Sequence, residues 1–187
     1  EMGGDLNCVN SGEPYWMVDP LDGTFNYYRG LPLYCVSIGL MVGLEPLLGV
    51  VHAFETQECF SGVVGQGCYL NGVLQNPLWA QQRQEACLLT GFPSGSDFST
   101  EAIGDFVQRV RSYKKIRMIG TAALALAYVA VGRADLYLEP HIKLWDVAGG
   151  LALVRAAGGV FRITPSPRGP ASYYVSAGPC SDWLDQL

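Results

Sequence analysis

Two aspartates three residues apart follow a short apolar run near the start of the chain, in the string Trp16–Thr24 (WMVDPLDGT). Pro20 fixes its own φ angle and biases Asp19 toward an extended conformation, and Gly23 permits a close turn. We therefore expect a strand over 15–18 that runs into a turn carrying the carboxylates of Asp19 and Asp22.

This acidic turn has the ligands of a metal site. It can direct the carboxylates of Asp19 and Asp22 and the Leu21 carbonyl at one point, and such hard oxygen ligands suit Mg²⁺. If a helix begins next, the amides of Gly23 and Thr24 offer donors to a phosphate, and the Thr24 hydroxyl can orient a water. The alternative is a purely structural turn, because Asp-Pro and Asp-Gly pairs are common in turns and Asp often caps helices. A calcium EF-hand is excluded, because its loop alternates ligands and ends in a distant Glu.

Net charge and composition limit the kinds of partner that the chain can bind. The chain has 187 residues and a formal net charge of −5, so it lacks the general attraction for nucleic acid that a basic protein has. The longest apolar stretch, 35–54, is broken by Glu45-Pro46 and by glycines, which indicates two strands and no membrane helix. Six cysteines without a CxxC pair are expected to be reduced, and a cytoplasmic setting follows as the default.

The elements change in character along the chain. The first half predicts a short helix over 24–28 and an antiparallel sheet with strands over 15–18, 36–42, 47–52, 59–64 and 68–70, the last closed by an Asn71-Gly72 hairpin turn. The second half predicts helices over 101–112, 121–131 and 145–157 among strands over 86–90, 115–119, 134–138, 160–163 and 173–176. We expect two halves, 1–82 and 83–187, that form one α/β domain of stacked layers.

Further candidate site residues lie in the second half. Trp145-Asp146 opens an apolar helix, where an aspartate would ordinarily be a cap. Gly120-Thr121-Ala122 stands at a junction between a strand and a helix, where small residues let the backbone approach a ligand closely. Glu139 precedes Pro140 and, as a bare sequence feature, could equally be a solvated strand end.

Taken together, these strings resemble the inositol monophosphatase family. Trp16–Thr24, with Asn26, Gly30, Pro32 and the string 36–39 (VSIG), looks like its first signature, and 145–150 (WDVAGG) with 156–160 looks like its second. The resemblance implies an α-β-α-β-α sandwich of the inositol monophosphatase and fructose bisphosphatase type, a Mg²⁺ cofactor, sensitivity to lithium and a homodimer. It also implies that Asp146 is a metal ligand, that Glu139 accepts substrate hydroxyls, and that the loop of Gly120, Thr121 and Ala122 lines the substrate.

The front of the chain differs from the family pattern. The resemblance implies two N-terminal helices and a Glu-Glu motif before the acidic turn, and here Glu1 is the candidate for that motif. We therefore expect a chain without the family's N-terminal segment, with Glu1 as an additional metal ligand.

The expected reaction is Mg²⁺-dependent hydrolysis of a small phosphate monoester by a metal-activated water. Asp19 would bridge two ions, Leu21 and Asp22 would complete their shells, Asp146 would hold the second ion, and Thr24 would orient the nucleophile. The expected substrate is a small phosphorylated polyol, first a myo-inositol monophosphate, with histidinol phosphate, a sugar phosphate or an adenosine bisphosphate as alternatives. An alternative of another class is a non-catalytic member that binds metal or a partner.

Overall fold

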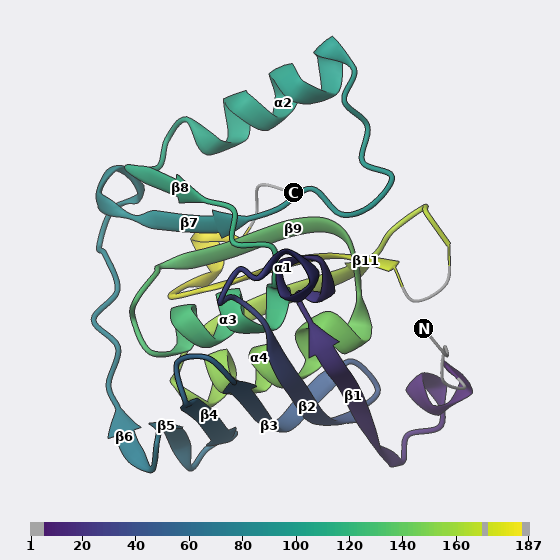
Figure 1. The fold of residues 1–187 in the computed structure, drawn as a ribbon, viewed down its shortest axis with the longest axis vertical. Coiled ribbons are helices and arrows are strands. Elements are labelled where there is room, and N and C mark those ends of the chain that lie inside the picture. Colours follow the sequence, from purple (N-terminus) through teal and green to yellow (C-terminus); the bar gives the residue numbers. More distant parts are fainter. Residues whose placement is uncertain (1–5, 170–171, 185–187) are drawn as a thin grey trace.

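The computed structural model describes residues 6–169 and 172–184, and its first half forms a six-stranded sheet (Figure 1). Every neighbouring pair in this sheet is antiparallel, and the strands follow one another in chain order. The strands are β1 (Pro14–Asp22), β2 (Cys35–Val42), β3 (Glu45–Ala53), β4 (Glu58–Val63), β5 (Gly67–Leu70) and β6 (Val73–Gln75).

The second half forms a five-stranded sheet in the order β10-β11-β9-β7-β8. Its strands are β7 (Cys87–Thr90), β8 (Lys115–Arg117), β9 (Leu136–Lys143), β10 (Val160–Pro165) and β11 (Ser172–Gly178). β7 runs parallel to β8 and β9, whereas the β9–β11 and β10–β11 pairs are antiparallel. The sheet is therefore mixed.

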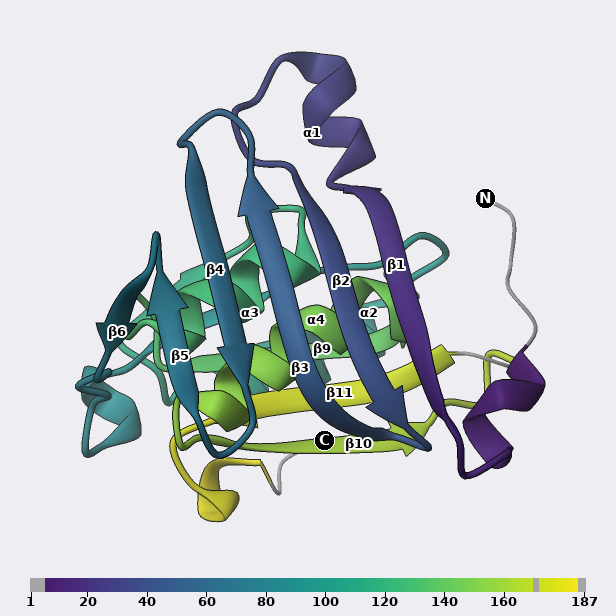
Figure 2. The same ribbon diagram turned by 90° about the horizontal axis from the view of Figure 1, so that it is seen from below.

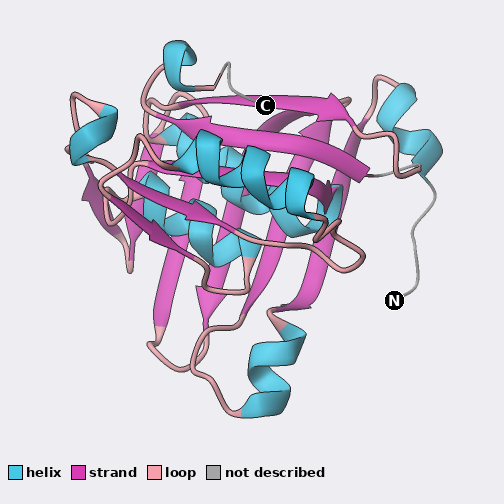
Figure 3. Cartoon of the chain, turned by 90° about the horizontal axis from the view of Figure 1, so that it is seen from above, coloured by secondary structure: helices cyan, strands magenta, loops and turns pink. Residues whose placement is uncertain are grey.

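The helices and sheets stack in layers. The α-helices are α1 (Thr24–Arg29), α2 (Thr100–Val110), α3 (Ala122–Ala130) and α4 (Leu144–Ala156), and short 3₁₀ helices span Leu6–Asn10, Arg83–Glu85 and Ser181–Trp183. α3 and α4 lie between the two sheets, and α2 covers the other face of the five-stranded sheet (Figure 1, Figure 3). Within the described residues no α-helix covers the outer face of the six-stranded sheet (Figure 2).

The sequence of each helix explains its place. α3 and α4 are apolar on nearly all sides, which suits helices enclosed by a sheet on each face. α2 instead has one apolar stripe, whose Phe106 and Val110 pack on Leu88, Leu136 and Leu138 of the sheet. The opposite side of α2 is polar and faces solvent.

Glycines bring α4 unusually close to the six-stranded sheet. A Cβ added at Gly49 of β3 would lie 2.1 Å from the Gly149 carbonyl oxygen, and one added at Gly39 of β2 would lie 2.8 Å from the Gly149 nitrogen. The helix backbone therefore rests on the strand backbone with no side chain between them. This contact fixes the height of α4 above the sheet and hence the position of its first turn.

The layered α/β class is confirmed, and each expected helix and strand is present with shifted ends. Two expected turns are wrong: β1 continues through Asp22 instead of ending at Asp19-Pro20, and Glu45-Pro46 lies inside β3, because the turn is made by Gly43 and Leu44. The division at residue 82 stays a prediction. None of the helices in the described part of the chain is long and apolar enough to span a membrane.

Candidate metal and phosphate site

A β-bulge places Asp19 and Asp22 on the same face of β1. Side chains three apart on a regular strand point to opposite faces. Here Asp19 pairs with Ser37 and Asp22 pairs with Cys35, so β1 carries one residue more than β2 between these pairs. The extra residue shifts the alternation of side chains by one position, so both carboxylates lie on the face of the strand that is turned toward α3 and α4.

The Asp22 carboxylate is buried and held by the start of α3. Its Oδ2 accepts hydrogen bonds from the Thr121 hydroxyl and from the Ala123 backbone N–H, the latter at 2.7 Å. Burial raises the pKa of Asp22 to about 6, hydrogen bonds from Thr121, Ala123 and the Gly23 backbone oppose that rise, and the charge of Asp19 adds to it. Both partners from the start of α3 therefore bind Oδ2 and leave Oδ1 clear of that helix.

Asp146 joins these two carboxylates from the first turn of α4. Its Oδ2 accepts the Lys143 backbone N–H at 3.3 Å, so the aspartate also caps its helix. One carboxylate oxygen each of Asp19, Asp22 and Asp146 lies within 4.8 Å of the other two. Burial, then Asp22 and Asp19, raise the pKa of Asp146 to about 8, as expected for like charges gathered without a cation.

The donor chemistry of this triad fits Mg²⁺. All three ligands are hard carboxylate oxygens, and a divalent cation would relieve their mutual repulsion. Cys35 lies close by, with its Sγ 3.9 Å from Asp22 Oδ2, but burial raises the pKa of this thiol and keeps it neutral. The site therefore lacks the thiolate that a softer metal would favour.

The Leu21 carbonyl and the Thr24 hydroxyl lie beside the triad. Thr24 Oγ1 donates to the Leu21 carbonyl oxygen at 2.8 Å, and the Leu21 N–H donates to Asp19 Oδ1 at 3.0 Å. The carbonyl keeps a second lone pair, and the exposed Thr24 oxygen can still accept a hydrogen bond. Gly23 has a φ of 84°, and a Cβ there would lie 2.7 Å from the Leu33 carbonyl oxygen, so this close turn needs glycine.

The loop before α3 contributes mainly by positioning. Thr121 and Ala122 are each only 5% exposed, and the Thr121 oxygen accepts the Leu124 N–H as the helix cap while its proton goes to Asp22. Gly120 is exposed and has a φ of 72°. The substrate-binding roles expected for these residues remain predictions.

Glu139 points from β9 toward the same interior layer. Its Oε2 accepts the hydroxyl of the fully buried Tyr137 at 2.9 Å, and a Cβ added at Gly91 would lie 2.8 Å from its Oε1. Burial raises the pKa of Glu139 to about 7, and the charge of Asp22 adds to this while the Tyr137 hydrogen bond opposes it. Glu139 is therefore an enclosed acceptor and not a solvated strand end.

The roles of some supporting residues could not be found from the sequence. Asn26 was named there only as part of the first signature; in the structure it donates from Nδ2 to the carbonyls of Leu33 and Ile119 and so ties α1 to the loop before α3. The backbone of Ala123 and the hydroxyl of Tyr137 act through contacts between segments far apart in the chain, and no local pattern reports such contacts. Glu1 lies outside the described residues.

Comparisons with known proteins identify relatives of this chain. The family model described as the inositol monophosphatase family matches residues 1–183. An inositol monophosphatase of Mesembryanthemum crystallinum is 44% identical over 157 residues, which cover 79% of this chain and 56% of that protein. The Nus factor SuhB of Xylella fastidiosa is 41% identical over 174 residues, 87% of this chain and 62% of that protein.

A solved structure of similar fold is that of inositol monophosphatase from Anabaena (Nostoc) sp. PCC 7120. It superimposes with a TM-score of 0.80 at 31% identity, over 95% of this chain and 71% of that one. The chain thus spans about 56 to 62% of the length of these two curated relatives.

Proposed function

Because the chain belongs to the inositol monophosphatase family, we propose that it carries the core of a Mg²⁺-dependent phosphatase acting on small phosphate monoesters. The observation that carries this proposal is the convergence of Asp19, Asp22 and Asp146 from three different elements. Three buried or half-buried carboxylates destabilise a metal-free protein, and a cation is the simplest group that offsets their repulsion.

Each site residue has a role in this proposal. Asp19, Asp22, Asp146 and the Leu21 carbonyl would hold Mg²⁺, which lowers the pKa of water and neutralises phosphate charge. Thr24 accepts a hydrogen bond from the attacking water, because its own proton is donated to the Leu21 carbonyl. Thr121 and the Ala123 N–H keep Asp22 in one orientation.

For the substrate, we propose first a myo-inositol monophosphate. The name of the Mesembryanthemum relative supports this choice, and Glu139 offers a buried acceptor for a hydroxyl of a polyol. Histidinol phosphate, a sugar phosphate and an adenosine bisphosphate remain alternatives, because the same carboxylate core suits any phosphate monoester.

We further propose that the chain forms a homodimer, is located in the cytoplasm and is inhibited by lithium. Support for self-association comes from large apolar side chains at the surface around α1, where Phe25 is 73% and Tyr28 is 79% exposed and Leu31 and Met118 are also exposed. The second candidate function is a partner-binding role without turnover, which the relative named Nus factor SuhB motivates.

The test is phosphate release with and without Mg²⁺ from inositol 1-phosphate, histidinol phosphate and adenosine bisphosphate, using the chain and its Asp22→Asn variant. We expect Mg²⁺-dependent release that falls by at least about a hundredfold in the variant, since one ligand is lost. Asp105→Asn, on the distant helix α2, is the matched control. Mg²⁺ binding without release from any of the three would favour the partner-binding function.

A further inference from the structure

The side chain of Asn26 lies between the acidic turn and the loop before α3. Asn26 is on α1, two residues after Thr24, and is only 7% exposed. Its Nδ2 donates to the Leu33 carbonyl oxygen at 2.8 Å and to the Ile119 carbonyl oxygen at 2.7 Å. Both protons of the amide are therefore used, one within the first half of the chain and one across to the second half.

The two carbonyl groups depend on this amide. Leu33 and Ile119 lie outside the helices and strands, so neither carbonyl has a partner in a sheet or a helix. Within residues 6–169 and 172–184, neither carbonyl accepts a hydrogen bond from any protein group other than Asn26. A half-buried carbonyl that loses its donor carries a desolvation penalty. The amide therefore stabilises the approach of two segments that share no hydrogen bond of their own.

Gly120 shows that the loop is fitted to the same amide. A Cβ added at Gly120 would lie 3.0 Å from Nδ2 and 3.1 Å from Oδ1 of Asn26, which are the nearest atoms it would meet. The φ of Gly120 is 72°, a conformation that glycine adopts without strain. The backbone of the loop therefore packs directly on the Asn26 amide.

The loop that Asn26 holds is also the segment that holds Asp22. Thr121 follows Gly120 directly, and its hydroxyl donates to Asp22 Oδ2. The Ala123 N–H donates to the same oxygen at 2.7 Å. A short chain of contacts therefore runs from the Asn26 amide through the loop to the Asp22 carboxylate.

From these contacts we propose that Asn26 is a positioning residue of the metal site, which acts on the Asp22 carboxylate through the segment 119–123. When the amide is lost, the segment moves more freely, and Thr121 and Ala123 no longer hold Asp22 in one orientation. The inference rests on the proposed function for the identity of the cation. The link between Asn26 and Asp22 is a property of the metal-free protein and can be tested without an ion.

The first test is amide hydrogen exchange in the metal-free chain. The Ala123 N–H lies in the first turn of α3, where N–H groups have no acceptor within the helix, so Asp22 is its acceptor. Asn26→Leu removes both donors but keeps a branched side chain. We expect it to speed exchange at Ala123 by about tenfold or more, because a hydrogen bond to a charged group is weakened. Exchange at the buried Leu151 of α4 should not change.

A second variant disturbs the same contact from the loop side. Gly120→Ala places a methyl group against the Asn26 amide, and we expect the same selective increase in exchange at Ala123.

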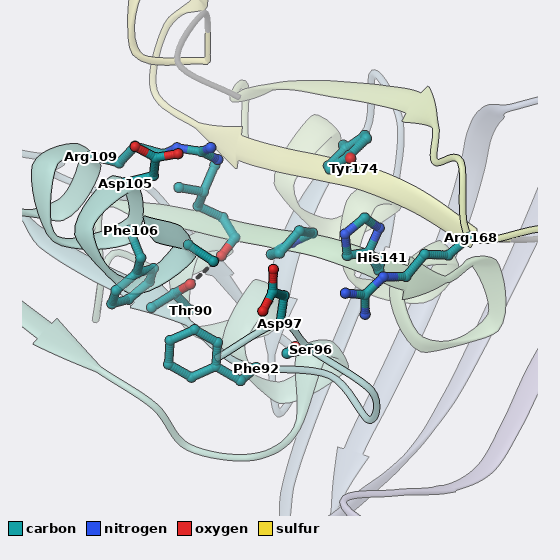
Figure 4. A pocket seen from close by; sticks show the side chains of 13 residues that line it. Thr90, Phe92, Ser96, Asp97, Asp105, Phe106, Arg109, His141, Arg168 and Tyr174 are labelled. Carbon is teal, nitrogen blue, oxygen red and sulfur yellow. Dashed lines mark hydrogen bonds between the residues drawn. The ribbon is translucent and has the colours of Figure 1, made fainter. Parts of the chain in front are cut away.

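The control is Phe106→Ala on α2. The Phe106 ring centre lies 4.8 Å from that of Phe92, and the ring lines a cavity of about 200 Å³ between α2 and the five-stranded sheet (Figure 4). This face of the sheet is turned away from α3 and α4. The variant loses packing and lowers the Tm, but it should leave exchange at Ala123 unchanged.

The second test is calorimetric Mg²⁺ titration. We expect Asn26→Leu and Thr121→Val each to weaken binding by about tenfold or more, as for other residues that orient a metal ligand. Because both act on Asp22 through one segment, the double variant should bind about as weakly as the weaker single variant. If the unsubstituted chain binds no Mg²⁺, the proposed function fails, and the exchange test still decides the role of Asn26.

Three results would overturn the role of Asn26. The first is unchanged exchange at Ala123 in Asn26→Leu. The second is equally faster exchange at Ala123 and Leu151, which would mean that the substitution loosens the whole core. The third is an effect on Mg²⁺ affinity that adds fully to that of Thr121→Val, which would mean that the two residues act independently.

Discussion

The backbone N–H of Ala123 donates to the Asp22 carboxylate across 2.7 Å, although the two residues are 101 positions apart in the chain. This hydrogen bond joins the first turn of α3 to the end of β1. With the Thr121 hydroxyl on the same oxygen, it fixes the carboxylate in one orientation before any ligand arrives. The orientation of a carboxylate of the proposed metal site therefore depends on helix α3, which contributes no carboxylate of its own.

Replacing Thr121 should test this dependence. Thr121→Val removes the donor to Asp22 and the cap of α3, so we expect a loss of about 1–2 kcal/mol in the free energy of unfolding and weaker Mg²⁺ binding by about tenfold or more. Thr121→Ser keeps the hydroxyl and should retain most of the stability and most of the Mg²⁺ affinity. Calorimetric Mg²⁺ titration and urea unfolding measure the two effects. Equal Mg²⁺ affinity in both variants would show that the hydroxyl does not position Asp22.

Mg²⁺ affinity should rise with pH. The pKa of Asp22 is raised to about 6 and that of Asp146 to about 8, so protons must leave these groups before they bind a cation. We expect apparent affinity to increase from pH 6 to pH 8 and to level off above that, with proton release detectable by titration in two buffers of different ionisation enthalpy. An affinity independent of pH over this range would contradict the assignment of both carboxylates as ligands.

The stability of the metal-free protein should change in the opposite sense. The folded pKa of both groups lies above the ordinary value of 3.8, so the folded state holds more protons than the unfolded state between pH 4 and pH 8. Stability then falls as pH rises through this window. We expect a lower Tm at pH 8 than at pH 6 in EDTA, and a smaller difference with Mg²⁺. An Asp146→Asn variant should also show a smaller difference.

The close contact of α4 with the six-stranded sheet makes Gly49 intolerant of a side chain. Gly49→Ala places a methyl group 2.1 Å from the Gly149 carbonyl oxygen, so we expect a loss of about 1–3 kcal/mol or more. Gly104→Ala is the matched control, because it lies inside α2 with nothing within 4 Å and should gain about 0.5–1 kcal/mol. Chemical denaturation should show a lower free energy of unfolding for Gly49→Ala and a higher one for Gly104→Ala, each relative to the unsubstituted protein.

Tyr137 should affect the recognition of hydroxyl-bearing substrates. Tyr137→Phe removes the hydrogen bond that opposes the raised pKa of Glu139, so this pKa rises further and the carboxylate is less often ionised at pH 7. We expect KM for inositol 1-phosphate to increase several-fold, with less change for an aryl phosphate that lacks ring hydroxyls. A similar change for both substrates would mean that the mutation disturbs the core rather than Glu139.

The sequence was most informative where structure is local. The short helix after Gly23, the Asn71-Gly72 turn and the apolar helix after Trp145 follow from turn residues and periodicity. The bulge in β1 could not be predicted in this way, because one extra residue on a strand is defined only relative to its partner, here Cys35 and Ser37 of β2. For the same reason the sequence does not reveal that Gly49 must lack a side chain, because that requirement comes from a helix a hundred residues later.

The cavity beside α2 shows a second limit. Arg109 lies on α2, His141 on β9 and Arg168 in the loop after β10, and nothing in their spacing relates them. The sequence around His141 likewise gives no sign of its place beside this cavity. Its positive φ and its contact with Ser166 arise from the bulge in β9 opposite Tyr174, which is again a property of strand pairing.

The bulge in β1 has a consequence for anyone who would transplant this site into another scaffold. Copying the string from Asp19 to Asp22 onto a straight designed strand would send its two acidic groups to opposite sides, since three is an odd number of steps. The portable unit is the string together with a partner strand shorter by one residue. Grafting must therefore carry over a pairing defect as well as a set of amino acids.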